Sequence, residues 1–222
     1  MRIAILGGTG DIGAGLALRF ARDTDHSVII GSRKHEKALD KASEYREALS
    51  ERGHDHNVSG TVNETAADEG DVVIAGIPPK YVTSTVESLA GALSDGTILV
   101  SPAVRMNRDR SGFHYDQPAE GSVAEALAAV APDEVPVVAA YQNLAAGVLS
   151  NLDAELGADV VVTGDDDDAT ATVRELTEEI DGLRALDGGM LANSAEVEGI
   201  TPLLINLAMN NDGMHNLGVR FE

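Results

Sequence analysis

Short apolar runs alternate with longer amphipathic segments over the first 140 residues, and this alternation constrains the fold more than any other feature. Six runs are expected as strands, at residues 2–6, 26–30, 57–62, 71–77, 97–101 and 135–140. Five segments with helical spacing of apolar residues lie at 12–22, 36–52, 63–69, 81–93 and 123–130. Strands that are apolar throughout suit a parallel sheet covered on both faces. The pattern therefore predicts an α/β fold with a Rossmann-type doubly wound parallel sheet.

Beyond about residue 145 the rhythm changes to one expected strand at 159–163 and two helices at 169–180 and 195–210. We expect a Rossmann domain at 1–145 and a small C-terminal α+β domain at 146–222. The acidic run at 165–168 precedes a helix, where negative charge is favourable, and this interpretation is preferred to a metal site. Asn193 and Glu196 have the spacing of a capping box, and Pro202 should bend the last helix.

The charge balance excludes several classes of partner. The chain has 37 acidic and 16 basic residues, only four of them Lys, and a net charge of -21. Such a surface repels nucleic acids and anionic membranes. It indicates adaptation to a salt-rich cytoplasm, with a moderately acidic mesophile protein as the alternative. The chain has no Cys, which excludes disulfides and thiolate zinc sites. Without a signal peptide or a membrane-length apolar run, we expect a soluble, cytoplasmic protein.

The segment GGTGDIG follows the first expected strand and opens the first expected helix. It fits G-x-G-x-x-G, which in this context is the pattern of a dinucleotide-binding turn. Gly8 would permit the tight turn, Gly10 would let a pyrophosphate approach the backbone, and Gly13 would allow close helix packing. Thr9 adds a hydroxyl donor, and the helix amides would face the phosphates. A purely structural turn is the alternative, although it needs fewer glycines.

The end of the second expected strand reads GSRK and has no carboxylate. An NAD site normally places Asp or Glu here to bind the ribose hydroxyls. Ser32 can instead donate to a 2′-phosphate, Arg33 can bind it with two parallel hydrogen bonds, and Lys37 can add charge. A solvated helix start is the alternative. The cluster predicts NADP rather than NAD.

The other strand ends carry apolar residues and prolines, with no Ser-His-Asp set, Lys–Tyr pair or metal cluster. His54 and His56 are close in sequence, but a solvated loop is the preferred interpretation. Reduction of an alcohol or imine usually requires a proton donor near the hydride path. Direct exchange between two planar cofactors needs positioning in a dry pocket instead. We therefore expect no catalytic acid or base and no metal.

The set GGTGDIG, GSRKHEK, IP, SPAV, GDDDD, EIDGLRALDGG, NS, TPLLINL and GMHNLGVRF resembles the F420-dependent NADP reductases of archaea and actinobacteria over nearly the whole chain. With the acidic composition, the resemblance points to a haloarchaeal member. It implies reversible hydride transfer between reduced coenzyme F420 and NADP in a homodimer, with the deazaflavin against the nicotinamide. Among the implied site residues, Leu217 closes the pocket. The implied NADP contacts are Thr9, Gly10, Asp11, Ile12, Ser32, Arg33 and Lys37, with Ile77, Val104 and Ala145 near the nicotinamide.

Three positions depart from the family pattern, and all lie on the deazaflavin side. Tyr141 stands where a His is often found, Leu144 where a Pro is common, and Arg105 where a Pro is frequent. Tyr141 is expected to stack on a cofactor ring or to hydrogen-bond to it, and Arg105 to meet the acidic tail of F420. Two alternatives stay open: an NADPH-dependent reductase of a flavin, ferric chelate or small imine, and a non-catalytic NADPH sensor.

Overall fold

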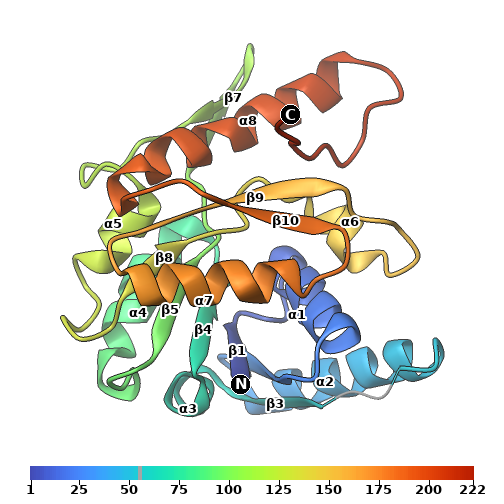
Figure 1. Cartoon of the computed structure of the whole chain (residues 1–222), viewed down its shortest axis with the longest axis vertical. Helices are drawn as coiled ribbons and strands as arrows, with labels where there is room; N and C mark the ends of the chain where they lie inside the picture. Colours follow the sequence, from blue (N-terminus) through green and yellow to red (C-terminus); the bar gives the residue numbers. More distant parts are fainter. Residues whose placement is uncertain (55–56) are drawn as a thin grey trace.

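The computed structural model describes residues 1–54 and 57–222. Eight strands form one sheet in the order β10-β9-β8-β5-β4-β1-β2-β3 (Figure 1). They are β1 (Arg2–Leu6), β2 (Ser27–Ser32), β3 (Val58–Val62), β4 (Val72–Ala75), β5 (Ile98–Ser101), β8 (Val137–Ala139), β9 (Ala158–Gly164) and β10 (Leu183–Asp187). A separate antiparallel hairpin pairs β6 (Met106–Asp109) with β7 (Gly112–Tyr115).

The helices that flank the sheet are α1 (Asp11–Asp23), α2 (His35–Ser50), α3 (Asn63–Glu69), α4 (Pro79–Ser88), α5 (Val123–Ala128), α6 (Ala146–Ser150), α7 (Asp167–Glu178) and α8 (Ser194–Asn210). Two short 3-10 turns lie at Ala90–Ala92 and Leu191–Asn193. None of the helices in the described part of the chain is both long enough and apolar enough to cross a bilayer.

The predicted doubly wound sheet is confirmed. The strands from β3 through β2, β1, β4 and β5 to β8 are parallel, and β10 is parallel to β9. Strand β9 runs antiparallel to β8, through Val138 opposite Gly164 and Ala139 opposite Thr163. The order reverses between β1 and β4, so the turn after β1 lies at the topological switch point, where open α/β sheets bind ligands.

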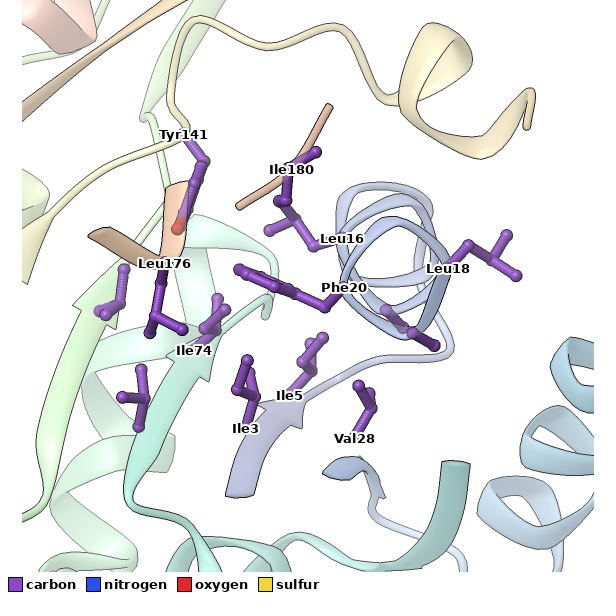
Figure 2. Close-up of a cluster of buried hydrophobic side chains, with 14 of the residues drawn as sticks. Ile3, Ile5, Leu16, Leu18, Phe20, Val28, Ile74, Tyr141, Leu176 and Ile180 are labelled. Carbon is purple, nitrogen blue, oxygen red and sulfur yellow. The ribbon is translucent and has the colours of Figure 1, made fainter. Parts of the chain in front are cut away.

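Two apolar layers cover the sheet, one on each face. One layer packs α1, α2 and α7 against β1, β2 and β4, and Figure 2 shows Phe20 of α1 and Leu176 of α7 meeting over Ile3 and Ile74. The other layer packs α3, α4 and α5 against the opposite face. Burial on both faces explains why these strands are apolar throughout.

Helix α1 is also fastened to the segment that follows β8. Arg19 is fully buried and donates to the carbonyls of Val148, Leu149, Asn151 and Ala154 at 2.7–3.0 Å. A Cβ at Gly15 would lie 2.5 Å from Cβ of Leu149, so only glycine allows this approach. The first helix and the β8–α6 segment are therefore held together as one unit.

In the second half of the chain, the structure differs from some of the sequence predictions and agrees with others. The hairpin, α6 and β10 were not expected from the sequence. The predicted capping box is wrong, because α8 begins without a side-chain cap and Asn193 donates to the carbonyl of Gly188. The acidic run does cap a helix, since Asp166 accepts from the amide of Ala169 at the start of α7. The division at residue 145 stays a prediction, and one sheet continues across it through β9 and β10.

Candidate functional site

The turn after β1 holds the shape that a phosphate-binding turn requires. Gly7 has φ +70°, and the amides of Gly8 and Gly10 donate to the carbonyls of Ile5 and Gly7 at 3.0 and 2.9 Å. Gly10 precedes α1, which begins at Asp11 with no side-chain cap. The first amides of α1 are therefore not covered by a capping side chain and can face an anion.

Glycine is required at Gly13 by close packing. A Cβ there would lie 2.8 Å from the carbonyl oxygen of Gly7 and 2.9 Å from Cα of Gly8. A Cβ at Gly10 would meet nothing nearer than 3.4 Å, so the backbone at Gly10 stays open to an incoming group. Tyr45 of α2 stabilises the turn by donating a hydrogen bond to the carbonyl of Gly8 at 2.8 Å. Burial raises the pKa of the Tyr45 hydroxyl to about 12. Sequence reasoning missed Tyr45, because its spacing on α2 indicates only a core residue.

The tip of β2 adjoins the turn because Gly31 pairs with Leu6. Ser32 is buried and accepts a hydrogen bond from the amide of Lys34, whereas Arg33 and Lys37 are exposed. Among the described residues, Arg33, Lys34 and Lys37 take part in no ion pair. Unpaired cations at one strand tip, in a chain with net charge -21, favour an anionic ligand.

The remaining predicted NADP contacts follow the neighbouring strands. Ile77 is half-buried after β4 and reaches within 3.3 Å of the position a Cβ would take on Gly7. Val104 is buried after β5, and Ala145 is half-buried after β8. Since these strands are adjacent, the residues lie along one edge of the sheet, spanning roughly 19 Å from β2 to β8 at the usual strand spacing. Thr9 and Ile12 are half-buried on the turn itself, and Asp11 is exposed.

The side chain of Tyr141, which the sequence predicts to contact a cofactor ring, lies in the core in this structure. Tyr141 has φ +71° and is 1% exposed, and its ring meets Phe20 edge-on at 6.2 Å. Figure 2 shows the side chain pointing from the β8–α6 connection into the core, toward Leu176. Its hydroxyl hydrogen-bonds to Thr177 Oγ1 at 3.0 Å, and burial raises its pKa. The left-handed backbone conformation of Tyr141 directs its ring into the core, while the residues that follow it border a cavity.

The residues after Tyr141 line a cavity of about 420 Å³. Its wall combines the β8–α6 connection, one face of α8 and residues near the C-terminus. The lining residues are Gln142, Asn143, Leu144, Ala145, Ala146, Thr201, Leu204, Ile205, Ala208, Met209, His215, Asn216 and Leu217. The cavity is thus apolar over most of its wall, with a few amide groups, as small-molecule sites usually are.

Gln142 borders this cavity and is a buried polar residue whose side chain has no hydrogen-bond partner. It is 3% exposed, and neither its amide nitrogen nor its amide oxygen has a partner. Asn143 donates to the carbonyl of Asp159 at 2.6 Å, yet its Oδ1 is unpaired. Buried polar atoms without partners are costly unless a ligand or water satisfies them. Sequence reasoning chose Tyr141 and missed Gln142, because the burial of both side chains depends on tertiary packing.

Arg105 lies away from that cavity. It forms an ion pair with Asp116 at 2.6 Å and lines a second cavity of about 460 Å³ between α4, the hairpin and α5. Lys80 contributes another cation there, and Glu120 adds a carboxylate. His54 lies outside both linings, and His56 falls outside the described residues.

The chemistry open to this edge of the sheet follows from its residues. The β1–α1 turn offers backbone donors, the β2 tip offers cations, and the β8–α6 connection offers an apolar wall. His215 is the one ionisable residue in the lining of the 420 Å³ cavity, and across the described chain no group of three His, Asp or Glu residues stands together as a metal site. Such a site can bind and align two planar groups, which suits hydride exchange between them.

Comparisons with known proteins agree with this geometry. Residues 2–105 match the family described as NADP oxidoreductase, coenzyme F420-dependent. The chain is 45% identical over 213 residues to a protein named F420-dependent NADP reductase from Methanocaldococcus jannaschii, covering 93% of this chain and 92% of that protein. A protein of the same name from Methanothermobacter marburgensis is 40% identical over 223 residues, covering 99% and 97%. A solved structure from Arthrobacter sp. FB24, described as an F420-dependent NADP reductase, has a TM-score of 0.81 at 22% identity, covering 100% of this chain and 99% of that one.

The position of Tyr141 leads to a test. We expect Tyr141→Phe to lower the free energy of unfolding by about 1 kcal/mol, because one buried hydrogen bond to Thr177 is lost. Binding of either cofactor should stay unchanged, since the ring faces the core. Denaturant unfolding and cofactor titrations measure the two effects. Tyr81→Phe, which alters an exposed phenol, should leave stability unchanged. Weaker cofactor binding by Tyr141→Phe at unchanged stability would contradict the core assignment.

Proposed function

Because this chain belongs to the family of F420-dependent NADP reductases, we propose that it transfers a hydride reversibly between reduced coenzyme F420 and NADP. One observation carries the proposal: a glycine turn that leads into an uncapped helix and a cluster of cations after β2 share one sheet edge with a cavity of about 420 Å³, whose wall is mostly apolar. The first two features suit NADP, and the third suits a second planar ligand.

NADP would be held from the adenosine end by the tip of β2. Ser32 and Arg33 would bind the 2′-phosphate, with Lys37 adding charge. The pyrophosphate would lie over the β1–α1 turn, where the open backbone at Gly10 leaves room for it. The nicotinamide would then lie near Ile77, Val104 and Ala145. These assignments are supported by the strand order and by the cations without ion pairs.

F420 would occupy the cavity lined by Gln142 and α8. Leu217, on the wall contributed by the C-terminal residues, would exclude water from the ring. The predicted contact of Arg105 with the acidic tail of F420 stays a prediction, and its pairing with Asp116 would compete with it.

The two bound rings supply the hydride chemistry, as donor and acceptor. The protein's own residues bind, orient and shield them. Apolar residues such as Leu144 and Leu204 would keep the contact dry, and Thr201 fixes the connection by donating to the carbonyl of Gln142 at 2.8 Å. Positioning of this kind raises the rate without an acid or base. We infer that residues 146–222 provide most of the F420 side and residues 1–145 most of the NADP side.

We also infer that the protein is a cytoplasmic homodimer. The stretch from Ile200 to Asn211 has no charged residue, and Leu203, Leu207 and Met209 of α8 are 55%, 40% and 53% exposed. Two strongly acidic molecules repel one another over most of their surface. An uncharged apolar helix face is where a second copy can approach, so α8 is the proposed contact.

The function is tested by mixing the purified protein with NADPH and oxidised F420 in concentrated salt. We expect the visible absorbance of the deazaflavin to fall with turnover, and NADH to serve far less well than NADPH. The same assay is repeated with a flavin, a ferric chelate or a small imine as the acceptor in place of F420. Turnover with one of these and none with F420 would favour the alternative reductase. Tight NADPH binding without any turnover would favour a sensor.

Arg33→Ala tests the cofactor assignment. The lost contact is to the 2′-phosphate, and a hydrogen bond between charged groups contributes roughly 1.5–3 kcal/mol. We therefore expect NADPH affinity to fall by about 10- to 100-fold and NADH affinity to change little. Lys41→Ala removes the same charge farther along α2 and controls for long-range electrostatics. An equal loss for both dinucleotides would show that Arg33 supports the fold instead.

The dimer is tested by light scattering in concentrated salt. The wild-type protein should have twice the 23.1 kDa mass of the chain, and Leu203→Glu with Leu207→Glu should reduce it to a single copy. Leu39→Glu alters an exposed leucine on α2 and should leave the dimer intact. A wild-type monomer, or a double variant that stays dimeric, would contradict the assignment to α8.

A further inference from the structure

The C-terminal segment, residues 211–222, folds back along the sheet after α8 ends. In Figure 1 this red segment leaves α8, loops outward and returns toward β9. The amide of Asp159 on β9 donates to the carbonyl of Val219 at 2.7 Å. Strand β8 pairs with β9 only at Thr163 and Gly164, so the first half of β9 presents an open edge on that side. The C-terminal segment covers this edge.

One buried carboxylate fastens the segment. Asp159 is 1% exposed, and its two oxygens accept from Arg184 Nε at 2.9 Å and Nη2 at 2.6 Å. The same carboxylate accepts from the amide of Phe221 at 2.6 Å, and Arg184 also donates to the carbonyl of Phe221. The hydrogen bond from Arg184 holds the pKa of Asp159 below its usual value, so the pair stays ionised. Removing either partner would leave a half-satisfied charge beside the segment.

The same residue is joined to the cavity from the other side. Asn143 donates to the backbone carbonyl of Asp159 at 2.6 Å, and Asn143 lines the 420 Å³ cavity. His215, Asn216 and Leu217 line it from the C-terminal segment. Asp159 therefore lies between two walls of one cavity, and Val219 and Phe221 follow the lining residues by only a few positions.

We propose that Asp159, through its ion pair with Arg184, positions the C-terminal segment so that residues 215–217 form one wall of the F420 cavity, and thereby sets the affinity for F420. This inference rests on the proposed function. Asp159 touches neither cofactor in this role and is a positioning residue. The adenosine and pyrophosphate of NADP are assigned to the tip of β2 and the β1–α1 turn, whose residues do not line this cavity. The effect should therefore be much larger for F420 than for NADPH.

The test compares Asp159→Asn, Arg184→Met and a chain shortened by residues 219–222 with the wild type. We expect each to raise the Kd for oxidised F420 and the KM for F420 by about 10-fold or more, as loss of a charged hydrogen bond predicts. The KM for NADPH should stay within about twofold. Because both substitutions break one pair, the double variant should be no worse than the more affected single variant. Binding of oxidised F420, followed by its fluorescence, needs no turnover.

A second readout reports the segment directly. Carboxypeptidase should remove the last residues from Asp159→Asn and Arg184→Met much faster than from the wild type. Asp153→Asn, which breaks the exposed pair with Arg52, should behave as the wild type in every measurement. If Asp159→Asn fails to fold, the shortened chain carries the test alone, because it leaves the buried pair in place.

Two results would overturn the inference while wild-type turnover persists: unchanged F420 affinity in the shortened chain, or parallel losses for F420 and NADPH. A wild-type protein that does not reduce F420 would contradict the proposed function instead, and the ligand assigned to the cavity would fall with it.

Discussion

The contact between α1 and the segment after β8 holds the two sides of the site in one geometry. Buried Arg19 donates to four carbonyls of residues 148–154, and Gly15 lets Leu149 approach the helix backbone. Helix α1 begins at the glycine turn, and the segment begins at the wall of the 420 Å³ cavity. A guanidinium with several fixed donors suits this purpose, because it satisfies carbonyls that no regular element pairs. The distance between the glycine turn and the 420 Å³ cavity is thus set by the core.

The exposed cations after β2 contrast with the acidic surface of the rest of the molecule. The surface is strongly acidic, with a net charge of -21, yet Arg33 and Lys37 are exposed at the tip of β2, beside the glycine turn. Several other cations form ion pairs within the fold: Arg2 pairs with Asp71, Arg105 with Asp116, and Arg184 with Asp159. A local positive tip in an acidic surface attracts a phosphate without drawing other polyanions to the rest of the protein.

Backbone conformation decides which residues after β8 enter the core and which border the 420 Å³ cavity. Left-handed Tyr141 sends its ring into the core beside Phe20, and this places Gln142 in the cavity wall. Residues held in such conformations cluster at functional sites, where the surroundings impose them. Here the surroundings are the packed ring and its bond to Thr177.

The sequence by itself determined the alternation of strands and helices in the first half, the glycine turn and the NADP preference, because each depends on local periodicity or on residues adjacent in the chain. The turn after β1, the cations after β2 and the helix cap at Asp166 could all be predicted in this way. Only the tertiary structure decided that Tyr141 is a core residue, that Gln142 is left without partners, and that Asp159 fastens Phe221 across 62 positions. These depend on one φ angle and on contacts between distant segments, and neither leaves a periodic pattern in the sequence.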